Sequence, residues 1–169
     1  RDRFSKSHPA IYVVGDASKI ASIEVAPNGQ TAVHKTTSGM LAFTNHYTDE
    51  ALLWANTYKS KSSHSRLSRI THLMIHHPLP YTLNDFIEFS NDKTGEPDHS
   101  IWRVGGGPKK IRTLASWIVL LPRQGDPEVY VKLSNPNGPE KIFTFTLDRT
   151  FWNKVDLKKE ISGSQEASE

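Results

Sequence analysis

The sequence predicts an α+β fold with mostly antiparallel strands. Residues 1–47 and the last third of the chain carry short β-branched and aromatic runs, whereas the region between them has apolar residues at helical spacing. Short turn signals separate the runs near the amino terminus, so neighbouring runs are expected to pair antiparallel.

The amino-terminal region is expected to form a meander of three or four strands. The candidate strands are residues 11–14, 22–25, 31–37 and 39–43. Gly15-Asp16 closes the first of them, and Pro27-Asn28-Gly29 predicts a tight turn because Asn and Gly tolerate positive φ. The last candidate strand ends in the polar cluster Thr44-Asn45-His46, which makes this strand end a candidate site.

The strongest helix signal covers residues 62–77. The segment has one apolar face, a candidate N-cap at Ser62 or Ser63, and a stop at Pro78. The apolar face consists of Leu67, Ile70, Leu73 and Met74.

A second helix is expected from Thr82 through Phe89, because Thr82 is a candidate cap with Asp85 three residues further on. Residues 49–58 contain helix formers and predict a short helix. Residues 91–97 predict a polar loop.

The last third of the chain returns to strands. Residues 114–121 are apolar at nearly every position, which predicts a strand covered on both faces, and Pro122 ends it. Residues 129–133 and 143–147 alternate apolar and polar side chains, the period of half-buried strands. Residues 135–139 would join these two strands as a hairpin loop.

The composition indicates a globular chain with one core. The 169 residues are 36% hydrophobic, and no repeat or second domain boundary is visible. The 21 Lys and Arg barely exceed the 18 Asp and Glu and are scattered, so nucleic acid is not an expected partner. No apolar run approaches the roughly 20 residues that cross a bilayer. A cytoplasmic location is not separable from a periplasmic or secreted one.

Several kinds of site are disfavoured. The absence of cysteine removes disulfides, thiolate metal sites and an internal cysteine nucleophile. His72 and His76 have the i, i+4 spacing that suits zinc, but the segment lacks a Glu general base and a third ligand, so structural roles are expected. Gly105–Lys110 resembles a phosphate loop, yet a strand follows it where a helix N-terminus is needed. We expect a flexible loop there.

Two polar side chains have the chemistry of an acyl-transfer site. Asn45 either ends a strand by bonding to its own backbone or donates its neutral amide N–H to a developing oxyanion. Arg66, in the cluster Ser62-Ser63-His64-Ser65-Arg66, is either a solvated residue behind a helix cap or holds a nucleophile or carboxylate by forked hydrogen bonds. Both interpretations stay open for each residue.

Six segments, taken in order, resemble a known family. They are HPAIYVVGDA at 8–17, SIEVAP at 22–27, LAFTNHY at 41–47, SSHSRL at 62–67, DHSIWR at 98–103 and SNP at 134–136. Each is short, so their order and spacing carry the specificity. From about His8 to Leu147, the chain resembles the acyl-CoA:6-aminopenicillanic acid acyltransferase group of N-terminal-nucleophile (Ntn) hydrolases, relatives of choloylglycine hydrolase and penicillin V acylase.

The resemblance implies a four-layer αββα sandwich from an autocatalytically matured precursor. Its new N-terminal cysteine would be the nucleophile and, through its α-amino group, the base; no cofactor is implied. The family's oxyanion asparagine matches Asn45, and its active-site arginine matches Arg66, with Arg103 and Arg112 as competitors because the spacing differs among relatives. The expected neighbours of the site are Thr44, His46 and Ser65.

In this family the nucleophile and its strands precede the matching segment. Residues 1–155 are therefore expected to be the C-terminal portion of a single Ntn-type domain, followed by a polar, disordered tail over 156–169. The expected partners are the N-terminal segment that carries the cysteine and a small acylated amide substrate. Uncovered apolar faces would also favour a homo-oligomer.

The expected reaction is cleavage of a linear amide through a covalent acyl-enzyme. Hydrolysis is favoured over acyl transfer because water is always available as the second acceptor, and no turnover is expected of this chain alone. The alternative is a non-catalytic α+β binding module that kept the scaffold.

Overall fold

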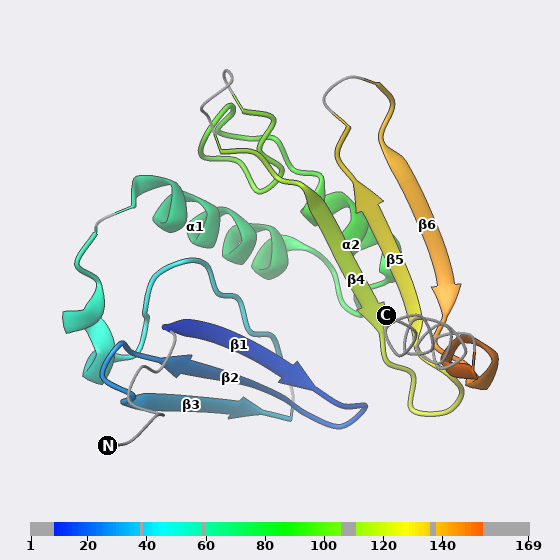
Figure 1. Ribbon diagram of the computed structural model, residues 1–169, viewed down its shortest axis with the longest axis horizontal. Helices are drawn as coiled ribbons and strands as arrows, with labels where there is room; N and C mark the ends of the chain where they lie inside the picture. The colour runs from blue at the N-terminus through cyan, green and yellow to red at the C-terminus, as the bar shows by residue number, and fades with distance from the viewer. Residues whose placement is uncertain (1–8, 38, 59, 106–110, 136–137, 154–169) are drawn as a thin grey trace, which may run out of the picture. The chain divides into compact units, whose positions relative to one another are not determined.

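The computed structural model describes residues 9–37, 39–58, 60–105, 111–135 and 138–153 (Figure 1). It divides into two compact units, residues 1–113 and 114–169, and each is described by itself. The first unit's elements are β1 (Ala10–Gly15), β2 (Ile20–Val25), β3 (Thr31–Thr36), the 3-10 helix η1 (Glu50–Ala55), α1 (Lys61–His76) and α2 (Leu83–Ser90). The second unit's elements are β4 (Ala115–Leu120), β5 (Glu128–Leu133) and β6 (Lys141–Thr146). Helices together with two antiparallel sheets confirm the α+β class.

Strands β1, β2 and β3 form an antiparallel sheet in chain order, as predicted. The turn between β2 and β3 is the predicted one. The Gly29 N–H donates to the Ala26 carbonyl at 2.9 Å, and Gly29 has a φ of 84°, which glycine adopts at little cost. Asn28 Oδ1 accepts the Gln30 N–H at 2.9 Å and closes the turn from its side chain.

The two faces of this sheet differ in burial. Alternation along β2 places Ser22 and Glu24 on one face, where both are fully buried. The Glu24 carboxylate accepts from the Thr48 backbone N–H at 2.8 Å and from the Thr48 hydroxyl at 2.7 Å, so its buried oxygens are satisfied. Next to it, Ala26, Tyr47 and Leu52 form a buried hydrophobic cluster. The opposite face stays about half exposed at Tyr12, Val14 and Val33.

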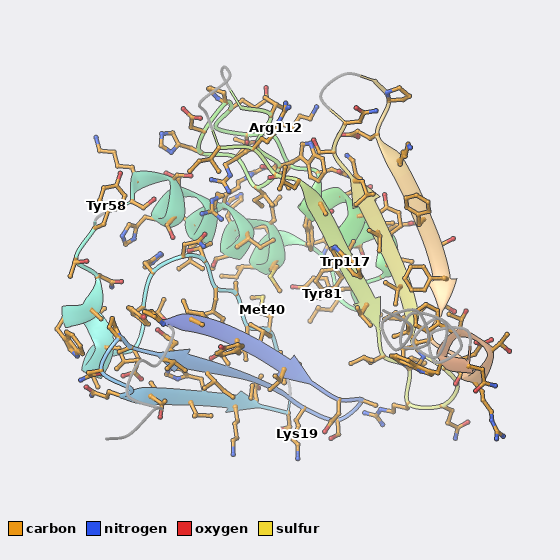
Figure 2. The ribbon with its side chains drawn as sticks, in the orientation of Figure 1. Lys19, Met40, Tyr58, Tyr81, Arg112 and Trp117 are labelled. Carbon is orange, nitrogen blue, oxygen red and sulfur yellow. The ribbon has the colours of Figure 1, made fainter. Side chains whose placement is uncertain are left out.

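Residues 39–43 do not form the predicted fourth strand of the meander. They run irregularly from Gly39, which has a φ of 86°, to Thr44. Met40 lies beside Tyr81, whose hydroxyl is 3.7 Å from the Met40 sulfur (Figure 2), and Thr44 is hydrogen-bonded to α1. The prediction was wrong because this apolar segment packs against the helical region and does not pair with β3.

Helix α1 begins one residue earlier than predicted and has a different cap. Ser60 Oγ accepts the Ser63 N–H at 3.2 Å and is the N-cap. Ser62, one of the two predicted caps, instead donates its hydroxyl to the Asp98 carbonyl at 2.5 Å. The other, Ser63, turns its side chain into the site described below. The helix ends at His76, before the predicted proline stop.

Helix α2 has the predicted cap. Thr82 and Asp85 form a reciprocal capping box, in which the Thr82 N–H donates to Asp85 Oδ2 at 2.6 Å. Behind α2, Asp92 binds Arg69 of α1, with Arg69 Nη2 at 2.6 Å from Asp92 Oδ2, so an ion pair joins α1 to the end of α2. The short helix predicted over 49–58 is η1.

In the second unit, β4, β5 and β6 form an antiparallel sheet in chain order, which confirms the three predicted strands and the hairpin between β5 and β6. Their burial differs from the prediction. Trp117 of β4 is 67% exposed although its apolar run predicted cover on both faces (Figure 2). Residues 129–132 of β5 are all buried although their alternation predicted one covered face. Lys132 can be buried because its ammonium reaches Glu140 at 2.6 Å and its stem is apolar.

Some predictions fall on residues that the structure does not describe. Residues 136–137 of the hairpin loop and the predicted tail over 156–169 lie outside the described ranges. The extent of a single domain over 1–155 stays a prediction. Within the described ranges, no helix is long and apolar enough to cross a membrane.

Candidate active site

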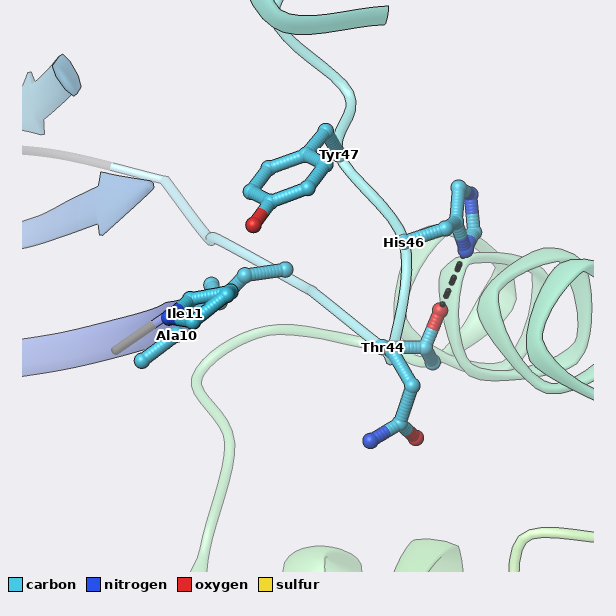
Figure 3. Close-up of a pocket in the computed structure, with 7 residues that line it drawn as sticks. Ala10, Ile11, Thr44, His46 and Tyr47 are labelled. Carbon is cyan, nitrogen blue, oxygen red and sulfur yellow. Dashed lines mark hydrogen bonds between the residues drawn. The ribbon is translucent and has the colours of Figure 1, made fainter. Parts of the chain in front are cut away.

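The Thr44–Tyr47 segment is fastened to the first turn of α1 through Ser63. The Thr44 hydroxyl donates to the Ser63 carbonyl at 3.0 Å, and Ser63 Oγ lies 2.8 Å from His46 Nδ1. Thr44 Oγ1 is itself 3.1 Å from the same ring nitrogen (Figure 3). Ser63 is fully buried and His46 is 9% exposed, so these bonds are shielded from competing water.

The protons of this network can be assigned for either neutral form of His46. If Nδ1 is unprotonated, the Ser63 hydroxyl donates to it. If Nδ1 carries the proton, it donates to Ser63 Oγ, and the Ser63 hydroxyl donates to Thr44 Oγ1 at 3.0 Å. In both cases the Thr44 hydroxyl donates its proton to a hydrogen bond with the Ser63 carbonyl. The segment is therefore held without an ionised group.

His46 favours its neutral form. Burial lowers the pKa of His46 below the ordinary value, and the positive charges of His64 and Arg66 lower it further, against an opposing effect of Glu24. The His46 and His64 rings lie 3.9 Å apart between centroids, close enough for two imidazolium charges to repel. The neutral ring is the form that fits this hydrogen-bonded position.

Asn45 sits between the two anchored residues and contacts Arg66, one helical turn after Ser63. Arg66 Nη2 donates to Asn45 Oδ1 at 2.8 Å. Because a guanidinium only donates, it must engage the amide oxygen, and the two N–H groups of Asn45 Nδ2 are left for another acceptor. Asn45 is exposed, and no other hydrogen bond of its side chain is found within the described residues. The alternative was a hydrogen bond from the Asn45 side chain to its own backbone, and no such bond is found among the described residues.

Arg66 is a partly buried cation next to a second one. Burial lowers the pKa of Arg66, and the charge of Arg103 lowers it further. Of the three arginines considered from the sequence, only Arg66 contacts Asn45 among the described contacts. Arg112 Nη2 instead donates to the Val104 carbonyl at 2.6 Å.

A cavity of about 290 Å³ opens beside Asn45 (Figure 3). Its walls are the start of β1 and the segment just described, so residues more than thirty positions apart share it. The lining residues are Pro9, Ala10, Ile11, Thr44, Asn45, His46 and Tyr47. The cavity is lined by apolar side chains and a small number of polar groups, as is typical of small-molecule sites.

The structure brings together most of the predicted site residues and adds one. Thr44 and His46 line the cavity with Asn45, whereas Ser65 is exposed and lines a different hollow with His64 and residues further along α1. Ser63 was missed as a site residue. Its position three residues before Arg66, on the same helix face, is the signal that could have revealed it.

The other predicted motifs lie apart from this cavity. His72 and His76 have ring centroids 4.1 Å apart, and His76 Nδ1 lies 2.8 Å from the His72 carbonyl. In the part of the chain that the structure describes, no group of three His, Cys, Asp or Glu residues could hold a metal ion. Residues 106–110 of the glycine-rich segment are outside that part.

Comparison with known families identifies the chain. The family model of acyl-coenzyme A:6-aminopenicillanic acid acyl-transferase matches residues 1–138. The chain belongs to this family. No curated protein matches it. Membership in the acyl-transferase family indicates an acyltransferase or hydrolase, and the matched range contains Asn45, Ser63, Arg66 and the whole cavity.

Proposed function

We propose that this chain supplies the oxyanion-binding side of an Ntn-type active site that cleaves a linear amide. The observation that carries the proposal is the hydrogen bond from Arg66 Nη2 to Asn45 Oδ1, 2.8 Å long, which leaves the Asn45 N–H groups available at an exposed position. A neutral amide donor aimed at a developing negative oxygen stabilises an acyl-transfer transition state without titrating. Family membership supports this chemistry.

The nucleophile in this proposal is a cysteine thiolate outside these 169 residues, because the sequence contains no cysteine. Its sulfur bonds to the substrate carbonyl carbon, and the carbonyl electron pair moves to the oxygen, where Asn45 donates. The C–N bond then breaks, and the amine leaves with the proton that the α-amino base had taken from the thiol. Water next adds to the thioester and releases the acid and the thiol. These residues alone are expected to show no turnover.

Arg66 has two effects on Asn45 in this proposal. Its donated hydrogen bond fixes the rotamer of the amide, so the donor is in place before the reaction begins. The positive charge also draws electron density toward Asn45 Oδ1 and makes the N–H groups better donors. The buried Thr44–His46–Ser63 network holds the backbone on both sides of Asn45 and supports the same role.

We further propose hydrolysis over acyl transfer, since water is always available as the second acceptor. The fold proposed for the complete domain is the four-layer αββα sandwich, which is consistent with two antiparallel three-stranded sheets and helices. In that arrangement the cysteine-bearing segment and a small acylated amide are the partners, and a homo-oligomer would cover further apolar surface.

The test is Asn45→Ala in the protein that includes the cysteine-bearing segment. Loss of the donor should lower kcat roughly a hundredfold or more and leave the melting temperature unchanged. Asn84→Ala, which removes an exposed asparagine from α2, is the matched control and should retain activity. Near wild-type turnover in Asn45→Ala would reject the oxyanion role. Absence of any cysteine-dependent turnover in the complete protein would favour the non-catalytic binding module.

A further inference from the structure

Two exposed histidines in the last turns of α1 hold their rings side by side. His72 and His76 are four residues apart, and their ring centroids lie 4.1 Å from each other at an interplanar angle of 31°. The i, i+4 spacing places both imidazoles on one face of the helix. An ion that binds to one ring therefore meets the second at a high effective concentration. The pair is a preformed chelate of two nitrogen ligands.

The hydrogen bond of His76 determines which of its nitrogens can bind an ion. His76 Nδ1 lies 2.8 Å from the His72 carbonyl oxygen. Because a carbonyl only accepts, Nδ1 carries the proton, and the lone pair of the neutral ring is on Nε2. Metal-binding histidines commonly donate their other ring N–H to a carbonyl in this way, which fixes the tautomer and the ring orientation. Within the described ranges, no hydrogen bond engages the ring of His72.

The surroundings of the pair favour a positive ion. His72 and His76 line a hollow of about 320 Å³ together with Glu88 and Asp92. The carboxylate of Asp92 is balanced by Arg69 at 2.6 Å, whereas Glu88 forms no ion pair in the described part of the chain and adds negative charge to the hollow. The C-terminal end of α1, at His76, also carries the negative end of the helix dipole.

The neighbouring histidines are less suited to bind an ion. His77 lines the same hollow, but its Nδ1 lies 3.0 Å from a backbone carbonyl and its Nε2 lies 3.2 Å from the Asp85 carboxylate, so both of its nitrogens are engaged. His46 and His64 also stack, yet His46 is only 9% exposed and its Nδ1 is 2.8 Å from the Ser63 hydroxyl oxygen. His72 and His76 are thus the accessible pair.

We propose that His72 and His76 bind a zinc ion, His76 through its Nε2 atom. Imidazole nitrogen is a preferred ligand of zinc, whereas magnesium prefers oxygen. No group of three His, Cys, Asp or Glu residues in the described part of the chain could form a protein cage, so water completes the coordination and the site stays open. The hollow shares no lining residue with the cavity beside Asn45, and the proposal does not depend on the proposed function.

Zinc binding is measured by calorimetry on the 169-residue chain at neutral pH, with magnesium as the comparison ion. Zinc is expected to bind and magnesium is not. His72→Gln and His76→Gln should each weaken zinc binding at least about tenfold, because a single imidazole remains and the chelate is lost. His64→Gln, at an exposed histidine of the same helix outside the hollow, is the matched control and should keep the affinity of the wild type. Circular dichroism verifies that the variants remain folded.

Two further measurements complete the test. Zinc should raise the melting temperature of the wild type but not that of the double variant of His72 and His76, because only the folded helix holds the two rings together. In NMR spectra of the wild type, zinc should shift the ring signals of these two histidines, a result that requires no substitution.

The proposal is overturned if the folded wild type does not bind zinc, if the folded double variant binds zinc as tightly, or if zinc shifts only the signals of other histidines. Equal binding of magnesium would also overturn it, since that result would assign the ion to the carboxylates. The effect of Asn45→Ala on kcat is measured separately, so none of these results decides the oxyanion role.

Discussion

Ser63 Oγ lies 2.8 Å from His46 Nδ1, and this contact ties the residue after Asn45 to the first turn of α1. Arg66 lies three residues after Ser63 and donates to Asn45 Oδ1 at 2.8 Å. A single helical turn thus anchors the segment and provides the partner of its central side chain. The position of the Asn45 amide follows from the packing of this turn.

Replacing Ser63 with alanine should loosen the segment. The change leaves the Thr44 hydroxyl, at 3.1 Å, as the remaining partner of His46 Nδ1 among the described contacts. We expect a loss of about 1–3 kcal/mol in the free energy of unfolding, measured by urea denaturation. In the protein that includes the proposed cysteine-bearing segment, kcat should fall more than KM changes, because the proposed oxyanion donor Asn45 would be misplaced. Ser68→Ala, at an exposed serine of the same helix, is the control, and an equal effect of both substitutions would contradict this prediction.

Acidification should destabilise the chain in part through His46. The folded-state pKa of His46 lies below its ordinary value, mainly because the ring is buried, so the unfolded state binds the proton more readily. The contribution is fully present above the unfolded value of about 6.5 and is lost as the pH falls toward the folded-state pKa. His46→Gln should reduce the drop in melting temperature between pH 8 and pH 5. His99→Gln, at an exposed histidine, is the comparison, and NMR titration of His46 at or above its ordinary pKa would refute the prediction.

The ion pair between Arg69 and Asp92 should stabilise the helical region. Arg69 Nε lies 3.1 Å from each carboxylate oxygen, and Nη2 lies 2.6 Å from Oδ2, so the guanidinium binds through two nitrogens. Arg69→Gln should cost about 1–2 kcal/mol at neutral pH, a value below that of a fully buried pair because both side chains retain some exposure.

The pH dependence of Arg69→Gln follows from Asp92. Burial acts to raise the pKa of Asp92, but the hydrogen bond and charge of Arg69, together with Thr94, lower it overall. The stability that this carboxylate contributes is therefore present above its unfolded value of about 3.9 and is lost as the pH falls further. The difference between wild type and variant in thermal denaturation should shrink in acid. If the difference in stability between wild type and Arg69→Gln grows in acid, the Arg69–Asp92 ion pair is not the source of that difference.

The turn between β2 and β3 should depend on Gly29. Its φ of 84° lies in the left-handed region, where a Cβ atom costs about 1 kcal/mol or more. Gly29→Ala should lower the unfolding free energy by that amount, and Gly29→Asn should lower it less because Asn tolerates this conformation. Urea denaturation of both variants decides the matter, and an equal loss would rule out backbone strain as the cause.

Local signals predicted the elements that depend on neighbours in sequence. The Thr82–Asp85 capping box and the Pro27–Gly29 turn are made by residues a few positions apart, and the structure contains both. Predictions of burial were less successful. The apolar run of 39–43 predicted a strand, yet it packs against other parts of the first unit, and β5 is buried on both faces in spite of its alternation. Apolar periodicity records where hydrophobic groups occur but does not specify which partner covers them.

The sequence by itself determined the α+β class, the positions of most helices and strands and the family resemblance, and it suggested Asn45 as a site residue. Only the tertiary structure decided which arginine Asn45 meets, because Arg66 is 21 residues away in the chain and Arg103 and Arg112 have the same chemistry. It also revealed Ser63, an ordinary serine in a polar run until its hydroxyl is buried against His46. The physical reason is the distance along the chain over which interactions act. Helix propensity and capping act within one or two turns, whereas a site forms when segments far apart in sequence are packed into contact.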